Sequence, residues 1–410
     1  MPPAGLDKLK HIVVLMLENR SFDHMLGGLK SVDPRIDGLD GTEFNLDTKG
    51  KKAPVKSQAA YQGQLDPDPD HHFEGVDLQL FDGNMAPDRV ATMGGFVKSY
   101  FNIRRDVGHS RQIMYFYKPE RLPVLTTLAT EFAVFNGWFS SIPGPTLPNR
   151  AFAHYGSSFG HVDMNIFYPN TEFKSVYQRL DAAGKTARIY YFDQKSSTME
   201  VVNLLQHQPK FFGLFDQFLA DCETGQLPNY SLIEPNYSDH EENGVPVMAS
   251  DQHPDHDVRE GERLIARVYN GIKGNPQLWE STALLITYDE HGGIYDHVPP
   301  PACIPDGFVA QPADTKTGKP FLFDRLGVRV PAVLVSPWIA KRTVVPGVGA
   351  AGSRIFEHAS IPATVTDLFV PAFDQDPANK RSVREKQSQR FIDVLTLDQM
   401  RDDTPDFVLI

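Results

Sequence analysis

Short apolar runs alternate with amphipathic stretches along most of the chain. The apolar runs predict strands over residues 12–17, 131–135, 187–192, 230–233, 283–288 and 329–335. Several runs are continuous rather than strictly alternating with polar residues, which is typical of strands buried on both faces. Apolar residues at helical spacing predict helices over 175–183, 258–272 and 360–368. This alternation indicates an α/β fold with a mainly parallel central sheet and helices on both of its faces.

Two stretches interrupt this pattern and predict long surface loops. Residues 30–70 are rich in Asp, Gly, Lys and Pro, and residues 299–320 contain six prolines. Long loops inside a domain often shape a substrate site. The composition changes nowhere abruptly enough to mark a second unit, so we predict a single domain over residues 1–410.

The composition and net charge of the chain indicate which classes of ligand it can bind. The chain has 410 residues and a formal net charge of −12. This acidic balance argues against a nucleic-acid partner, because a general nucleic-acid binder needs a basic surface to displace counterions. A phosphate-bearing substrate is compatible with the charge, because a bound cation reverses the local field.

The number of cysteines and the length of the apolar runs indicate where in or outside the cell the protein is expected. Cys222 and Cys303 are too few for a disulfide framework or a thiolate metal site. No apolar run approaches the roughly 20 residues of a membrane span. The run over 12–17 leads into Glu-Asn-Arg rather than a signal-peptide cleavage site. We therefore expect a cytosolic protein or the mature form of an exported one, with no transmembrane segment.

Polar side chains follow two of the predicted strands at the point where each strand ends. Glu18 and Asn19 follow the strand over 12–17, and Asp289 and Glu290 follow the strand over 283–288. In parallel α/β sheets, ligands bind beyond the carboxyl ends of the strands. Carboxylate and amide oxygens suit Ca²⁺, Mg²⁺ or Mn²⁺, and nearby histidines leave Zn²⁺ as an alternative. A turn or helix cap would explain one such pair, but two pairs favour a divalent metal site.

A hydroxyl group in a rigid setting follows the strand predicted over 131–135. In "SIPGPTLPNRAFAHYGSS", Thr146 lies between Pro145 and Leu147, and Pro148 is positioned to open a helix. A hydroxyl at a helix N-terminus lies where phosphate oxygens bind well. One interpretation is a helix N-cap threonine. The sharper one is a nucleophile, which needs a metal to lower the pKa of its hydroxyl.

Glycines and histidines complete the candidate chemistry. The two glycines of "DEHGGIYDH" allow a tight turn that brings Asp296 and His297 back towards the strand end, although a plain hairpin with surface side chains is an even alternative. Histidines can donate to phosphate oxygens or protonate a leaving group. Each one alone is more typical of a loop, and acidic neighbours also allow one of these runs to bind a second metal. The other candidates are His71, His72, His240, His253 and His256.

Four ordered motifs carry a family resemblance: "ENRSFDH", "TLPNR", "DEHGGIYDHVPPP" and "GVRVPAVLVSPW" followed by "KRTVVPG". They are similar to those of the phosphoesterase family that includes bacterial phosphatidylcholine-specific phospholipases C, plant non-specific phospholipases C and a respiratory-burst-inhibiting acid phosphatase. The resemblance implies an alkaline-phosphatase-like core. It implies a metal held by Glu18, Asn19, Asp289 and Glu290, with Thr146 as a further ligand and the nucleophile. It places the histidines of the phosphate pocket at His71 or His72, His253 and His297, with His240 and His358 as weaker matches.

The resemblance implies a metal-dependent hydrolase of phosphoric esters. Its phospholipase branch carries threonine where the acid-phosphatase branch has serine, so Thr146 favours a phospholipase C-like diesterase with a phosphothreonine intermediate. The alternative is an acid phosphomonoesterase acting on small soluble esters, because this chain lacks the C-terminal extension associated with lipid engagement in many bacterial relatives. Sulfatases share the spacing of Thr146, Pro148 and Arg150, but threonine cannot be oxidised to the aldehyde that a sulfatase needs.

The expected roles follow from this mechanism. Thr146 attacks phosphorus, and His72, His253 or His297 serves as a catalytic histidine. Asn19, His71, His240 and Arg150 are expected to bind substrate, with a structural salt bridge as an equal alternative for Arg150. The expected partner is a phosphate ester, with a phospholipid and transient contact with a membrane surface as one case. A rival of another class is a catalytically silent, metal-stabilised protein that holds a phosphorylated ligand.

Overall fold

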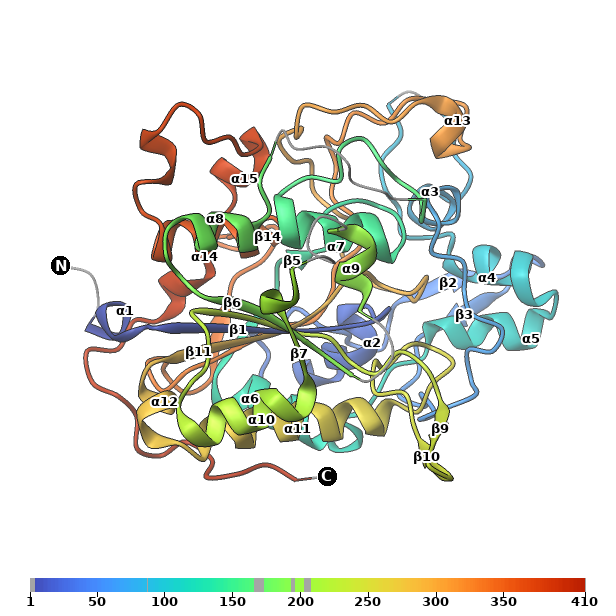
Figure 1. The fold of residues 1–410 in the computed structure, drawn as a ribbon. Helices are drawn as coiled ribbons and strands as arrows, with labels where there is room; N and C mark the ends of the chain where they lie inside the picture. Colours follow the sequence, from blue (N-terminus) through green and yellow to red (C-terminus); the bar gives the residue numbers. More distant parts are fainter. Residues whose placement is uncertain (1–3, 87, 166–172, 193–195, 203–207, 410) are drawn as a thin grey trace.

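An eight-stranded sheet forms the centre of the molecule. A computed structural model of the chain describes residues 4–86, 88–165, 173–192, 196–202 and 208–409 (Figure 1). The sheet contains, from one edge to the other, β13 (Thr343–Val345), β4 (Ala133–Phe135), β12 (Ala332–Val335), β11 (Thr282–Tyr288), β1 (His11–Leu17), β8 (Tyr230–Ile233), β6 (Ala187–Tyr191) and β7 (Phe212–Leu214). Only β12 runs antiparallel to its neighbours in this sheet. The predicted α/β class with a mainly parallel sheet is confirmed.

The two strands that matter most for the site lie side by side in the middle of this sheet. β1 pairs in parallel with β11, and Leu17 at the end of one strand is opposite Tyr288 at the end of the other. Every residue of β11, and all of β1 after His11, is buried. Burial of each large apolar side chain contributes roughly 1.5–3 kcal/mol. The residues that follow the two strands are therefore anchored to a rigid, buried part of the sheet and lie at the same edge of it.

Helices cover both faces of the sheet. Figure 1 shows α6 (Pro123–Glu131), α10 (Phe215–Thr224), α11 (Val258–Lys273) and α12 (Pro276–Glu280) on one face. It shows α7 (Thr146–Tyr155), α8 (Val176–Ala182), α9 (Ser197–Val201) and α14 (Ser360–Phe369) on the other. The three predicted helices correspond to α8, α11 and α14, and α8 begins with a capping box between Ser175 and Gln178.

The first long excursion builds a lateral unit with its own apolar cluster. It contains the hairpin of β2 (Phe44–Leu46) and β3 (Lys52–Pro54), and the chain beyond residue 70 adds α3 (Phe73–Phe81), α4 (Phe96–Arg104) and α5 (Val107–Ser110) to the same unit. Their core includes Val76, Phe96 and Tyr295, so the excursion packs against the turn that follows β11. The smaller helices are α1 (Ala4–Lys8), α2 (Phe22–Leu26), α13 (Pro312–Thr315) and α15 (Val383–Gln387). The smaller strands are β5 (Trp138–Phe139), β9 (His240–Glu242), β10 (Val245–Val247) and β14 (Phe356–Glu357).

Short 3-10 helices complete the described secondary structure. They are η1 (Gly27–Ser31), η2 (Arg111–Met114), η3 (Pro119–Arg121), η5 (Pro209–Phe211), η6 (Phe373–Gln375) and η7 (Phe391–Val394). Among the described residues, no helix combines the length and apolar character needed to cross a bilayer.

Two predicted strands were too long at their N-terminal ends. Glu131 ends helix α6, so the strand predicted over 131–135 is only Ala133–Phe135. The strand predicted over 329–335 begins at Ala332, directly after Pro331, which has no N–H to give to a ladder. The predicted loops over 30–70 and 299–320 also contain short elements, namely β2, β3 and α13.

A carboxylate from one helix caps the start of another. Helix α6 begins at Pro123, and its N-cap residue Leu122 offers no side-chain hydrogen bond. Glu262 of α11 instead accepts hydrogen bonds from the N–H groups of Val124 (2.7 Å) and Leu125 (3.2 Å). Burial raises the pKa of Glu262 to about 7, although these hydrogen bonds oppose the rise.

This buried carboxyl group predicts a pH-dependent stability. Between its ordinary pKa and about 7, the unfolded chain releases the proton and the folded chain keeps it. The contribution of Glu262 is therefore complete below that window and is lost as pH rises through it, by up to about 3 kcal/mol. We expect Glu262→Gln to remove this part of the pH dependence, as measured by urea unfolding at pH 5 and pH 7.5. Glu260→Gln on the same helix is the control, and equal pH slopes in all three proteins would contradict the prediction.

Candidate active site

The predicted polar residues at the two strand ends converge. Glu18 and Asn19 follow β1, and Asp289 and Glu290 follow β11, so the Leu17–Tyr288 pairing places them next to one another. The N–H of Asn19 donates to Asp289 Oδ1 at 3.1 Å. Asn19 has a left-handed backbone with φ of 56°, which asparagine tolerates better than most residues. The main chain therefore turns sharply here and locks one strand end to the other.

Thr146 faces this cluster from the start of helix α7. Its Oγ1 lies 3.4 Å from Asn19 Oδ1 and donates to it. The interpretation of Thr146 as the N-cap is wrong, because Pro145 occupies that position and Thr146 is the first helical residue. Pro148 lies inside the first turn rather than at its start, where its missing N–H leaves no lost hydrogen bond. The hydroxyl of Thr146 is thus free of a capping role.

Arg150 lies behind the cluster. Its Nε donates to Asp289 Oδ2 at 3.0 Å, and its Nη2 donates to Glu18 Oε1 at 3.2 Å. The side chain is 1% exposed, and a cavity in front of Glu18 is lined by other residues. The structure therefore places Arg150 in the structural salt bridge, and its predicted contact with substrate finds no support in this geometry.

The cluster carries more negative charge than Arg150 can balance. Burial and the neighbouring Asp289 raise the pKa of Glu18 to about 8, against the opposing charge of Arg150. Burial, together with the charge of Asp289, raises the pKa of Glu290 to about 8 as well. Glu290 Oε1 is buried and has no hydrogen-bond partner in the part of the chain that the structure describes. An orphaned carboxylate oxygen among acidic neighbours fits a divalent cation, whose ligands would be Glu18, Asn19, Thr146, Asp289 and Glu290.

A cavity of about 250 Å³ opens in front of three of these residues. Glu18, Asn19 and Thr146 lie on its wall together with His71 and His253. The remaining lining mixes apolar and polar side chains, namely Leu147, Met164, Ser197 and Tyr237. Burial alone would lower the pKa of His253, but its hydrogen bond to Asp255 and the charges of Asp68 and Glu18 raise it to about 10. The cavity thus brings together part of the acidic strand-end cluster, the hydroxyl of Thr146 and the imidazoles of His71 and His253.

Three other predicted histidines lie elsewhere. His72 stacks on His71, but its side chain is 53% exposed and its Nδ1 pairs with Asp70. His240 begins β9 on the outlying β9–β10 hairpin (Figure 1). His358 is buried behind the site, and its Nε2 donates to the backbone oxygen of Asp289 at 2.6 Å. None of the three lines the cavity over Thr146.

His297 belongs to a separate charged cluster. Its Nδ1 lies 2.7 Å from Asp23 Oδ2, and its Nε2 lies 3.3 Å from Asp37 Oδ1. Asp23, Asp296 and His297 have the donor atoms of a metal site, but the buried Arg329 already contacts Asp23 (2.9 Å) and Asp296 (3.2 Å). Arg329 supplies the positive charge here, so the predicted tight turn ends in a structural ion-pair cluster rather than beside the hydroxyl of Thr146.

Comparison with known proteins identifies the chain. The family model described as "Phosphoesterase family" matches residues 9–370. The chain belongs to this phosphoesterase family. Non-specific phospholipase C1 of Arabidopsis thaliana is 41% identical over 88% of this chain and 67% of its own length. Non-specific phospholipase C6 of the same plant is 42% identical over 88% of this chain and 68% of its own length. Phospholipase C A of Mycobacterium tuberculosis is 27% identical over 87% of this chain and 72% of its own length.

A comparison with solved structures finds one of low similarity. It is described as a protein in the alkaline phosphatase superfamily from Vibrio parahaemolyticus, with 11% identity and a TM-score of 0.42 over 97% of this chain and 71% of that one. Similarity at this level transfers no residue role. The family membership and the phospholipase C relatives make this phosphoesterase a hydrolase of phosphate esters.

Sequence reasoning missed a third acidic strand end in the phosphoesterase. Glu234 directly follows β8, the strand on the other side of β1. Its carboxylate accepts hydrogen bonds from Thr198 N (3.1 Å), Thr198 Oγ1 (3.2 Å) and Tyr237 Oη (3.2 Å), and from the hydroxyls of Ser196 and Ser197. Glu234 thereby fixes α9 beside the cavity. The same strand-end rule that singled out Glu18 would have found it.

The predicted glycine turn is built for close approach. Gly292 and Gly293 have φ of 64° and 67°. A Cβ atom on Gly292 would lie 2.1 Å from the backbone oxygen of Asn19. Backbone of this conformation and proximity accepts glycine alone.

We expect Gly292→Ala to damage the site through Asn19. The added methyl group must displace the Asn19 backbone, and a shift of about 1 Å at a reacting centre can cost on the order of 10²-fold in rate. The measurement is phosphoesterase turnover together with urea unfolding. Gly184→Ala is the control, because Gly184 has φ of 68° but no atom within 4 Å of its Cβ position. Equal turnover in both variants would contradict the prediction.

Proposed function

We propose that this phosphoesterase cleaves a phosphodiester in the manner of a phospholipase C, with Thr146 as nucleophile and a divalent cation at the two strand ends. The observation that carries the proposal is the position of the Thr146 hydroxyl, 3.4 Å from Asn19 Oδ1 and on the same cavity wall as Glu18. The relatives named phospholipase C support the choice of a diester.

The cation would be held by Glu18, Asn19, Asp289 and Glu290, with Thr146 beside them. When bound, a divalent cation lowers the pKa of a coordinated hydroxyl and offsets charge on phosphate oxygens. Arg150 holds Asp289 and Glu18 in place from behind. His358 supports the backbone of Asp289 from the other side. The protein thus fixes its carboxylates before any substrate arrives.

Thr146 Oγ1 forms a bond to phosphorus while the bond from phosphorus to the departing alcohol oxygen breaks. The loose transition state spreads charge over the equatorial oxygens, which the start of the ten-residue helix α7 and the amide of Asn19 face. One of the two cavity histidines, His71 or His253, gives a proton to the departing oxygen. Water then attacks phosphorus and gives a proton to the same imidazole, while the bond from phosphorus to Thr146 Oγ1 breaks. Thr146 takes up a proton from solvent, which replaces the one it released to solvent before its attack.

A cavity of about 250 Å³ accommodates a phosphate and a compact head group. Lipid chains would remain outside it, where a transient contact with a membrane surface would hold them. A panel of phosphodiesters and phosphomonoesters, run across pH with and without chelator, tests the substrate class. Faster turnover of monoesters at acid pH would replace the proposal with an acid phosphomonoesterase.

Asp289→Asn tests the metal site. We expect the variant to lose the strand-end cation, because the change removes a negative charge and weakens the hold of Arg150 on the cluster. Elemental analysis of the purified protein after dialysis against Mn²⁺ measures how much metal each variant binds. Asp296→Asn is the control, since Asp296 is equally buried but pairs with Arg329. Unchanged metal content in Asp289→Asn would place Asp289 outside the ligand set.

A further inference from the structure

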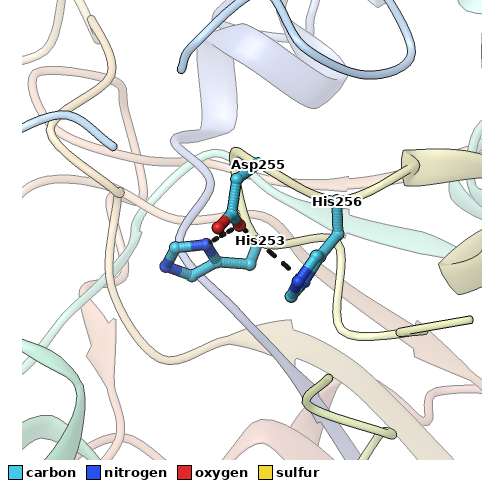
Figure 2. Close-up of side chains that lie close together, drawn as sticks. All are labelled: His253, Asp255 and His256. Atoms are coloured by element: carbon cyan, nitrogen blue, oxygen red, sulfur yellow. Dashed lines mark hydrogen bonds and ion pairs between the residues drawn. The ribbon is translucent and has the colours of Figure 1, made fainter. Parts of the chain in front are cut away.

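A second group of metal donors lies on the loop between β10 and α11, outside the strand-end cluster. His253, Asp255 and His256 each offer one donor atom, and these atoms all lie within 4.8 Å of one another. Figure 2 shows the Asp255 carboxylate joined to both imidazoles. We propose that this triad is a second metal site of the phosphoesterase and that it takes Zn²⁺.

The donor types select the ion. Two imidazole nitrogens and one carboxylate, with a fourth position open to water, are a zinc ligand set. The strand-end cluster, by contrast, offers oxygen donors, which suit harder cations. His253 Nδ1 is hydrogen-bonded to Asp255 Oδ1, and His256 Nδ1 lies 3.8 Å from the same oxygen. Zinc would replace the proton that His253 and Asp255 share, as metals commonly do on binding.

Carboxylates also support the triad from outside. His253 Nε2 lies 3.7 Å from Asp68 Oδ2, so one ring nitrogen faces the triad and the other faces a carboxylate. This arrangement orients metal-binding histidines in general. Asp251 Oδ1 accepts a hydrogen bond from His256 Nδ1 at 2.8 Å, which is the nitrogen that also faces Asp255, so zinc would have to replace this hydrogen bond.

Hydrogen bonds fix the backbone of the triad before any metal binds. Arg20, buried behind the loop, donates to the backbone oxygens of Gln252 (2.6 Å) and His253 (3.0 Å). The N–H of His256 donates to the His253 oxygen at 2.9 Å, which closes a turn and brings the two rings to a centroid distance of 5.8 Å. A preformed loop loses little conformational freedom on binding a metal, and this favours affinity.

The site touches the proposed mechanism through His253, which also lines the cavity over Thr146. Zinc on Nδ1 would keep the remaining ring proton on Nε2. Because Nε2 faces Asp68, that carboxylate would hold the proton, and His71 would be the proton donor to the departing alcohol. This assignment rests on the proposed function, whereas the zinc site itself stands on the triad alone.

Metal counting with Zn²⁺ as the probe tests the site. Full-length protein is freed of metal with chelator, titrated with ZnCl₂ by calorimetry, and analysed for bound zinc after dialysis. We expect His256→Gln and Asp255→Asn each to lose one equivalent or to weaken it by at least about tenfold. His109→Gln is the control, because His109 also lies near an acidic residue, Asp106, but outside the triad. Co²⁺ substitution adds a spectroscopic readout, and its four-coordinate absorption should disappear in His256→Gln.

The outcomes separate this site from the proposed catalytic one. If His256→Gln and Asp255→Asn bind as much Zn²⁺ as the unchanged protein, and with the same affinity, the zinc site is refuted. If Asp289→Asn keeps all metal while His256→Gln loses an equivalent, the zinc site stands and Asp289 is not a ligand of the proposed strand-end cation.

Discussion

Thr146→Ala is expected to lose turnover by at least about 10³-fold while keeping its metal. Removal of a nucleophile abolishes the covalent route and leaves only what binding and electrostatics supply. The variant should still fold, because Thr146 donates a single weak hydrogen bond, to Asn19, and caps no helix. Steady-state kinetics on a phosphodiester, with elemental analysis of the same sample, measures both properties.

Thr146→Ser is the matched control for this variant. It keeps the hydroxyl and removes only the methyl group, so most of the turnover should remain. Mass spectrometry of acid-quenched reactions should find phosphate on residue 146 of the unchanged protein. Turnover of Thr146→Ala at the unchanged rate would remove Thr146 as the nucleophile, and a catalytically silent binding protein would show no phosphorylated residue at all.

Arg150→Met is expected to lower the free energy of unfolding by about 3–5 kcal/mol. The change leaves the carboxylates of Asp289 and Glu18 buried next to each other without the guanidinium group that both contact. Removing one partner of a buried ion pair typically lowers stability by about 3–5 kcal/mol. Activity should fall as well, because Asp289 loses the group that orients it. Urea unfolding in the presence of chelator measures the effect on stability.

Arg35→Met provides the comparison for Arg150. Arg35 pairs with Asp33 at the surface, with its side chain 59% exposed, and exposed pairs contribute about 0–1 kcal/mol. Divalent cation should recover part of the stability lost in Arg150→Met, because it supplies charge to the same carboxylates. Equal stability of the two variants would show that Arg150 does not balance the cluster.

The sequence was most informative where local chemistry and strand order agree. Glu18 and Asp289 could be placed together because parallel strands end at the same edge of a sheet. The antiparallel direction of β12 could not be predicted, because its apolar run resembles those of the strands that are parallel to one another. The location of His297 was also out of reach, since it depends on Arg329, which is distant in sequence. Glu234 could have been found, since it follows a strand that the apolar pattern predicted correctly.

The strand-end site cannot form until β1 pairs with β11, and this determines how late in synthesis of the chain the site appears. Asn19 and Asp289 are 270 positions apart, so the first half of the site leaves the ribosome long before its complement. Contacts of such long range delay folding, because a large loop must close before they form. Until then Glu18 remains an ordinary solvated acid, and any affinity for the cation appears only with the last stages of assembly.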